Sequence, residues 1–330
     1  MFDLGKLKDG TPRVRKKSRY RVLNHSEYNQ SLRKRGMLSL YFPKGDLEKL
    51  LVDVQPYKKG ISGRGPTYLP AYVELIFIMY RLFNWGQRQI TGFFEDHWRI
   101  RGINLPVPSF GNLSDLFAQL SPERLELCKR AVKKLKKRKA VNLIVDSTGL
   151  TFGKASDWHR VKYGINPVNR PWRKWHIAMD EDFNILGSNI TNCNVPDINE
   201  LDNIIPEDID IESLLGDGGY YSKEQIEKLL ELGIQPIIPP PKNAKVHGLE
   251  GTKYHDEIVK YIEEKGKHAY KNKFGYGARE LVESQFSRVK RCIGDFLLTQ
   301  RDESQKIESE IISSIINFWN SLGRPITEKI

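Results

Sequence analysis

Cysteine is scarce in this sequence. The 330 residues contain only three, Cys128, Cys193 and Cys292, which lie far apart and form no CxxC pair. An odd number of widely spaced thiols makes no disulfide framework, and a structural zinc site needs clustered Cys or His ligands. We therefore expect reduced, mostly buried thiols and no zinc.

Long hydrophobic runs are also missing. Spanning a bilayer takes about 18 apolar residues, and the best candidate, residues 75–83, is interrupted by Arg81. The first ten residues lack the apolar segment of a secretory signal. We expect a cytoplasmic protein that does not enter a membrane.

The composition is that of a folded, basic protein. Hydrophobic residues make up 39% of the chain and charged residues 28%, and the formal net charge is +12. This much apolar surface excludes general disorder. Clustered Lys and Arg with a positive net charge indicate a partner with a phosphate backbone, although a solvated basic surface is the simpler alternative.

The first 139 residues divide into a basic arm and a helical region. Residues 1–66 carry many Lys and Arg with little periodicity, and we interpret them as a partly ordered arm and linker. Residues 67–139 show helical periodicity, and four helices are expected, at 69–83, 87–99, 110–120 and 122–137. Their order is compatible with a helix-turn-helix DNA-binding domain, but any small helical bundle gives the same pattern.

Residues 140–330 alternate between short apolar strands and helices, which predicts an α/β domain. Strands are expected at 141–145, 175–180, 185–191, 213–216 and 235–238. Helices are expected at 223–232, around 257–264, at 276–298 and at 307–322.

Two aspartates follow apolar runs in this domain. Asp146 and Asp217 each stand where a strand is expected to end, among small residues. Catalytic groups of open α/β sheets gather at the carboxyl ends of strands. Either aspartate alone is more simply a turn or cap residue, but their parallel placement favours a pair of carboxylates on one rim.

A third carboxylate lies on the expected helix 276–298. Tyr276, Arg279, Glu283 and Lys290 share one face at helical spacing. A solvated charged face is the alternative interpretation. Three carboxylates can hold two divalent cations, and oxygen ligands favour Mg²⁺ or Mn²⁺ for phosphoryl transfer. Arg279 and Lys290 would bind phosphates beside them.

The spacing of these four residues after Asp146 and Asp217 resembles the signature of insertion-sequence DDE transposases. Further segments resemble the family-five (IS4-like) branch, so the resemblance covers most of the chain. These segments are Tyr28–Asn29, Leu32–Gly36, Gly63–Pro66, Leu105–Pro108, Asp146–Leu150, Trp172–His176 and Gly275–Tyr276.

The resemblance implies a ribonuclease-H-like catalytic domain at 140–330, with a mixed sheet flanked by helices. It implies that Asp146, Asp217 and Glu283 bind two Mg²⁺ ions and catalyse cleavage and strand transfer. Tyr276, Arg279 and Lys290 would contact the transposon end, and the region before residue 139 would bind the terminal inverted repeats. A homodimer that joins two DNA ends, in a bacterial nucleoid, is also implied.

The sequence departs from this family in two places. Gly219-Tyr220-Tyr221 replaces a commoner Ala-Tyr-Asp, and the interval from Asp217 to Glu283 is too short for the large β-insertion of some relatives.

A basic segment with interspersed aromatic residues, 158–174, supplies further candidates. Lys162, Arg173 and Lys174 would contact DNA, with a structural hairpin as the alternative. His176 is interpreted as a core residue rather than a phosphate donor. Asn194 and Asp197 would support metal ligands or form a turn.

Two other functions stay open. A ribonuclease-H-like nuclease would hydrolyse DNA without strand transfer, and a basic N-terminal half argues against it. A catalytically inactive, transposase-derived protein would only bind DNA, and the presence of all three acids argues against that.

Overall fold

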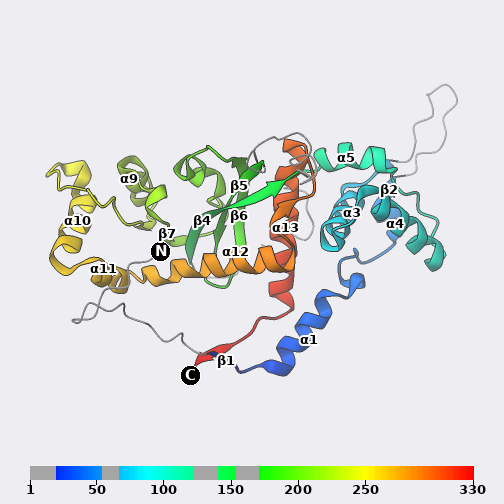
Figure 1. The fold of residues 1–330 in the computed structure, drawn as a ribbon, viewed down its shortest axis with the longest axis horizontal. Coiled ribbons are helices and arrows are strands. Elements are labelled where there is room, and N and C mark those ends of the chain that lie inside the picture. The colour runs from blue at the N-terminus through cyan, green and yellow to red at the C-terminus, as the bar shows by residue number, and fades with distance from the viewer. Residues whose placement is uncertain (1–19, 54–66, 122–139, 154–170) are drawn as a thin grey trace, which may run out of the picture.

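A mixed β-sheet forms the centre of the molecule in the computed structural model, which describes residues 20–53, 67–121, 140–153 and 171–330 (Figure 1). Five strands follow the order β6-β5-β4-β7-β8, and the short β9 pairs with the far end of β4. The strands are β4 (Val141–Phe152), β5 (Trp172–Met179), β6 (Ile185–Asn192), β7 (Ile211–Leu215), β8 (Gln235–Ile237) and β9 (Phe296–Leu297).

The strand directions divide this sheet into two halves. β6, β5 and β4 pair antiparallel, whereas β4, β7 and β8 pair parallel. This order, with three antiparallel strands followed by two parallel ones, confirms the expected ribonuclease-H-like α/β fold.

Helices cover both faces of the sheet. Side chains alternate along a strand, so Leu143 and Val145 of β4 pack on one face and Ile144 packs on the other. The first face is covered by α8 (Leu201–Ile204) and α9 (Lys223–Glu231), and the second by α12 (Glu280–Cys292) and α13 (Asp302–Leu322).

A helical segment connects β8 to α12 at one end of the molecule (Figure 1). It consists of η5 (Glu250–Thr252), α10 (Lys253–Lys265), α11 (Lys267–Lys273) and η6 (Tyr276–Arg279). Two further 3₁₀ turns follow strands of the sheet, η3 (Asp197–Glu200) after β6 and η4 (Gly218–Tyr220) after β7.

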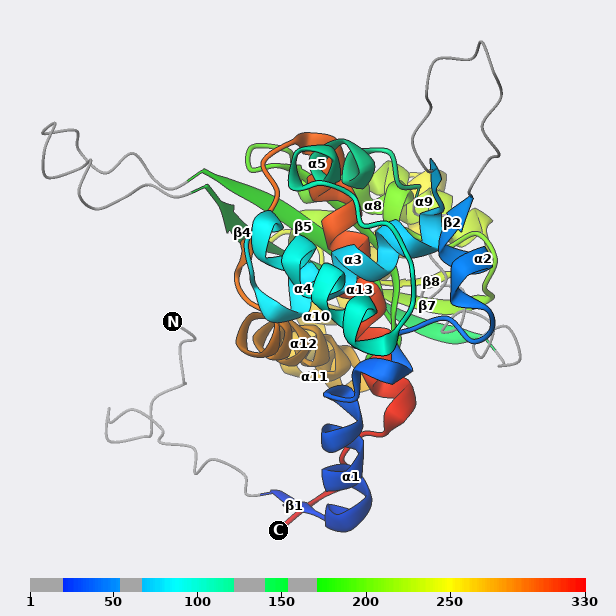
Figure 2. The same cartoon turned by 90° about the vertical axis from the view of Figure 1, so that its right-hand side faces the viewer.

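The helical region packs on the opposite end, beside α13 (Figure 2). It contains α3 (Pro70–Phe83), α4 (Gln87–Arg101) and α5 (Phe110–Ala118), close to the expected ranges. Pro70 occupies the first turn of α3, where its missing N–H costs no hydrogen bond. Buried side chains of α3 and α13 belong to one hydrophobic core. The helical region and the sheet domain therefore share one core, and the predicted boundary at residue 139 lies outside the described residues.

The described part of the basic arm packs against the C-terminal end of the chain. β1 (Tyr20–Val22) pairs antiparallel with β10 (Thr327–Lys329), and α1 (His25–Arg35) contacts α13. After it come η1 (Leu38–Leu40), α2 (Leu47–Leu51), β2 (Val52–Asp53) and β3 (Thr67–Tyr68). Residues 1–19 and the helix expected at 122–137 lie outside the described residues.

The bounds of two expected elements differ most from those in the structure. β4 continues to Phe152 instead of ending at Val145, because β5 pairs with it as far as Thr151. The helix expected over 276–298 was wrong at both ends: residues 276–279 form the 3₁₀ turn η6, and α12 ends at Cys292. Gly294 has a φ of +133°, which breaks the helix before β9 pairs with β4.

The expected burial of the cysteines is wrong for the two that the structure describes. Cys193 and Cys292 are free and exposed rather than buried, and Cys128 lies outside the described residues.

Within the described ranges, no helix is long and apolar enough to cross a membrane.

Candidate active site

Asp146 and Asp217 lie side by side because of the register between two parallel strands. Ile144 of β4 is paired with Leu215 of β7, so the residues two positions further on, Asp146 and Asp217, are neighbours. β7 ends at Leu215, and Asp217 begins η4, where its Oδ1 accepts a hydrogen bond from the Gly219 N–H at 2.8 Å. Asp146 lies in the middle of β4 and not at its end, but it does lie where pairing with β7 stops.

Glu283 reaches the same place from α12. Val282, Phe286 and Val289 are buried against the sheet, and this apolar stripe fixes the rotation of the helix. Asp146 shares the strand face of Ile144, which is the face that α12 covers. Glu283 stands beside the stripe with 54% of its side chain exposed.

One guanidinium group lies between the three carboxylates. Arg279 Nη2 is 2.8 Å from Asp146 Oδ2 and 4.0 Å from Asp217 Oδ2, and its Nη1 is 3.0 Å from Glu283 Oε1. Asp146 and Arg279 are mostly buried, whereas Asp217 and Glu283 are open to solvent. The sequence-predicted acids are thus brought together around one cation.

The burial and charges of this cluster shift its pKa values. Burial raises the pKa of Asp146 above its usual value; Arg279 and the Ser147 N–H oppose this, while Asp217 and Glu283 reinforce it. Burial lowers the pKa of Arg279, but the surrounding carboxylates, Asp146 first, leave it raised overall. The guanidinium therefore stays charged at any ordinary pH, and the cluster keeps a surplus of negative charge.

Asp197 adds a fourth carboxylate behind the rim. Ser147 Oγ donates to its Oδ1 at 2.8 Å, and Lys174 Nζ lies 3.3 Å from the same oxygen. His176 is fully buried, as the core interpretation predicts, with Nδ1 3.5 Å from Asp197. Burial lowers the pKa of His176, so it does not supply a charge at neutral pH.

Gly219 keeps space open between two of these acids. A Cβ at this position would lie 3.0 Å from Asp217 Oδ1 and 3.6 Å from Asp197 Oδ2. This glycine is one of the departures from the commoner family sequence, and it lets the two carboxylates approach the same point.

The other predicted DNA contacts fall in different settings. Tyr276 is partly buried next to Arg279, and Lys290 lies two helical turns beyond Glu283 on α12. Lys174 is bound to Asp197 and to the Val195 carbonyl oxygen. Arg173 pairs with Asp302 and donates to Gln305 at 2.8 Å, so its guanidinium is directed at α13. Lys162 lies outside the described residues.

The arrangement is not a formed metal site, but its donor set fits a divalent cation. Within the described residues, no group of three His, Cys, Asp or Glu side chains is placed to hold a metal ion. The three carboxylates nevertheless already surround a cation, the Arg279 guanidinium, and offer only oxygen donors. Such a set suits Mg²⁺ or Mn²⁺ rather than zinc.

Sequence reasoning missed one part of this region. The segment between β8 and η6 places Pro239–Lys242 and α11 next to Tyr276 and Arg279, where they line a cavity. The sequence signal for this segment is a group of Lys and aromatic side chains at 267–276.

Two family models of known proteins match this chain. A family model described as "Transposase DDE domain" matches residues 137–318, and a second with the same description matches residues 33–154. A chain in the "Crystal structure of the Mos1 Strand Transfer Complex" is 12% identical over 74% of this chain and 83% of that chain, with a TM-score of 0.21.

Proposed function

The chain belongs to the family of transposases with a DDE domain, and from this premise we propose that it binds the ends of its own mobile element, cuts them and joins them to target DNA. One observation carries the proposal most directly. Three carboxylates from β4, the β7–η4 junction and α12 all face one point at the edge of the sheet.

In this proposal Asp146, Asp217 and Glu283 hold divalent Mg²⁺ or Mn²⁺. When bound, two such ions activate an attacking oxygen and stabilise a leaving oxygen on phosphate. Backbone pairing with β5 fixes Asp146, and Asp217 caps the turn η4 directly after β7, whereas Glu283 is carried by a helix. The rigid sheet thus sets the site, and the exposed glutamate completes it.

Arg279 offsets part of the negative charge of the acids when no DNA is present. A scissile phosphate offers the same planar guanidinium two oxygens, the geometry that Arg binds as a fork. We expect Arg279 to turn from the carboxylates to that phosphate, and Tyr276 and Lys290 to bind the strand on either side of it.

The N-terminal regions supply the remaining functions of the proposal. Residues 1–66 and the helical domain at 67–139 bind the terminal repeats, and residues 140–330 carry out catalysis. A homodimer holds two ends together. The exposed Arg33 and Lys34 on α1, and Arg99 and Arg101 on α4, support a role in phosphate binding.

The test is metal-dependent cleavage of labelled DNA that carries the gene's own flanking sequences, in Mg²⁺, Mn²⁺ or EDTA. Wild type should cut at discrete flanking positions and join the product to a second duplex. Glu283→Gln should do neither. Glu224→Gln, which removes an exposed acid on α9 away from the site, is the matched control and should cut normally.

Two other results would replace this function. Cutting without joining would leave a nuclease. Binding of the flanks with no cutting by wild type in any metal would leave a DNA-binding protein.

A further inference from the structure

The register of β4 and β7 brings Asp146 and Asp217 together, but strand pairing ends before it reaches them. The last paired residues are Ile144 and Leu215. Beyond this point Asp146 is paired with β5, and Asp217 begins the turn η4. Carboxylates that bind the same cations need a defined separation. A contact other than strand pairing must therefore set the distance between these two acids.

Asp197 makes such a contact from the opposite face of the sheet. Ser147 shares the strand face that α8 and α9 cover, and its Oγ donates to Asp197 Oδ1 at 2.8 Å. Asp197 Oδ2 lies 3.6 Å from the point where a Cβ of Gly219 would stand, and Asp217 Oδ1 lies 3.0 Å from that point. η3, which Asp197 begins, contacts η4. One carboxylate thus connects the residue after Asp146 to the turn that holds Asp217.

The charge of Asp197 is balanced within this contact. Lys174 Nζ lies 3.3 Å from its Oδ1 and also donates to the Val195 carbonyl oxygen at 2.8 Å. His176 is fully buried beside the same oxygen, and burial holds its pKa below the usual value. A balanced carboxylate adds little to the negative charge that attracts a divalent cation. Asp197 therefore differs from the three carboxylates that share the Arg279 guanidinium.

The ring of Tyr220 packs beneath this contact. It is fully buried in the core that α8 and α9 form with the sheet. Burial raises the pKa of its hydroxyl, and Asp197, Asp146 and Asp217 raise it further, in that order. The phenol is therefore neutral and lies near all three acids, so the Asp197 contact and the metal-binding edge of the sheet pack on the same ring.

We propose that Asp197 is a positioning residue that acts through Ser147 to set the spacing of Asp146 and Asp217. The inference rests on the proposed function, because that function assigns divalent cations to these two acids. It gives Asp197 no direct contact with metal or DNA, and it gives Lys174 the role of balancing the Asp197 charge. Replacing a residue that orients metal ligands typically lowers metal affinity by about 10- to 100-fold.

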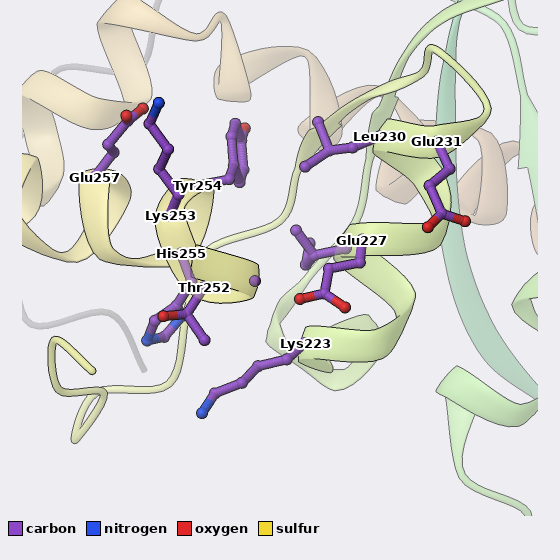
Figure 3. A pocket seen from close by; sticks show the side chains of 11 residues that line it. Lys223, Glu227, Leu230, Glu231, Thr252, Lys253, Tyr254, His255 and Glu257 are labelled. Carbon is purple, nitrogen blue, oxygen red and sulfur yellow. The ribbon is translucent and has the colours of Figure 1, made fainter. Parts of the chain in front are cut away.

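A separate group of acids provides the control. Glu227, Glu231 and Glu257 line a cavity of about 640 Å³ between α9 and α10, together with Lys223 and Lys253 (Figure 3). All of its lining residues belong to α9, η5 and α10, so it includes no part of β4 or η4. Glu227→Ala therefore removes an exposed carboxylate without changing the Asp197 contact.

Mn²⁺ binding to the full chain without DNA, measured by electron paramagnetic resonance, separates positioning from direct coordination. Asp197→Ala should bind Mn²⁺ about tenfold more weakly than wild type. Ser147→Ala should show a similar loss, and the double variant should lose no more, because each change removes the same hydrogen bond. Asp197→Asn keeps an oxygen acceptor for Ser147 and should bind nearly like wild type. Glu227→Ala should bind like wild type.

Three results would overturn the proposal. Equal losses in Asp197→Asn and Asp197→Ala, with Ser147→Ala unchanged, would make Asp197 a metal ligand itself. Wild-type affinity in Asp197→Ala would show that Asp197 does not set the spacing. A loss in Glu227→Ala as large as that in Asp197→Ala would mean that any removed negative charge weakens binding.

Hydrogen exchange decides the question if wild type binds no Mn²⁺ or if Asp197→Ala lowers the melting temperature. The Gly219 N–H donates to Asp217 Oδ1 at 2.8 Å, so its exchange reports on the turn that holds Asp217. In EDTA, the peptide containing Gly219 should exchange about fivefold faster in Ser147→Ala than in wild type, the effect of one lost hydrogen bond. Glu227→Ala should exchange at the wild-type rate. Unchanged exchange in Ser147→Ala would overturn the positioning role.

Cleavage of the gene's flanks is scored separately. If wild type cuts and joins but Asp197→Ala and Ser147→Ala bind Mn²⁺ normally, the positioning role fails and the transposase stands. If wild type neither cuts nor binds Mn²⁺ but the exchange result is as expected, Asp197 positions the turn and the proposed function fails.

Discussion

Arg81 and Arg279 both face carboxylates, but in opposite settings. Arg81 of α3 lies 3.3 Å from Glu308 of α13, and both side chains are fully buried. Glu308 also accepts hydrogen bonds from the backbone and side chain of Thr299. Arg279 faces three acids, two of them open to solvent.

The difference separates a structural cluster from a functional one. One acid and one arginine, both fully buried, are out of reach of another ligand. Three acids around one arginine retain negative charge and are accessible, so they can accept further cations and release the guanidinium to a phosphate. The two clusters therefore differ in the number of acids per arginine and in the exposure of those acids to solvent.

The largest expected effect comes from removing an acid of the exposed cluster. Asp146→Asn should lower the cleavage rate by at least about a thousandfold, which corresponds to ~4 kcal/mol of transition-state stabilisation. The readout is single-turnover cutting of flanking DNA. The melting temperature should change little, because the buried carboxylate already has a raised pKa. A variant that cuts normally would remove Asp146 from the site.

Breaking the sealed pair should act on stability instead. Arg81→Met leaves Glu308 buried without its cation and should cost about 3 to 5 kcal/mol in the free energy of unfolding. Urea denaturation measures this. The double variant Arg81→Met with Glu308→Leu should recover most of the loss. If the double variant is no better than the single one, the charge pair is not the cause.

Glu310 is a carboxylate of α13 that has no arginine beside it among the described residues, and its pKa is shifted by burial. Burial raises its pKa to about 7, while a hydrogen bond from Ser188 opposes the shift. No ion pair to another described residue neutralises it. The folded state therefore holds a proton that the unfolded state releases near pH 4.5, so stability should fall as pH rises from about 4.5 to about 7.

Glu310→Gln tests this directly. It should flatten the pH dependence by about 2 kcal/mol over that window, measured by urea denaturation at several pH values. Ser188→Ala would remove the opposing hydrogen bond and is the comparison. A wild-type profile that rises across this window would contradict the assignment.

The smallest expected effect concerns the exposed arginine. Arg279→Gln leaves the acids without their cation, so the variant should lose about 1 kcal/mol in EDTA, a melting shift of about 2 °C. Mn²⁺ should restore more stability to this variant than it adds to wild type. Equal Mn²⁺ responses would mean that Arg279 and the metal do not share the carboxylates.

Much of the site could be predicted because it depends on residues that are close together in the sequence. Asp146 and Asp217 each follow an apolar strand, and the Tyr276, Arg279 and Glu283 spacing is local. The bounds of β4 and α12 were not predictable. The length of β4 depends on its pairing with β5, and the end of α12 depends on β9, which pairs with β4. Both partners are distant in the sequence, so neither contact leaves a periodic signal near Asp146 or Gly294.

The sequence by itself determined the fold class, the three acids and the basic character of the chain, because alternation, spacing and charge are properties of neighbouring residues. Only the tertiary structure decided that Arg279 lies between the acids, that Arg81 is paired with Glu308, and that Pro239–Lys242 closes a cavity beside them. Each of these depends on the packing of segments distant in the chain, where the position of one side chain is set by the burial of many others.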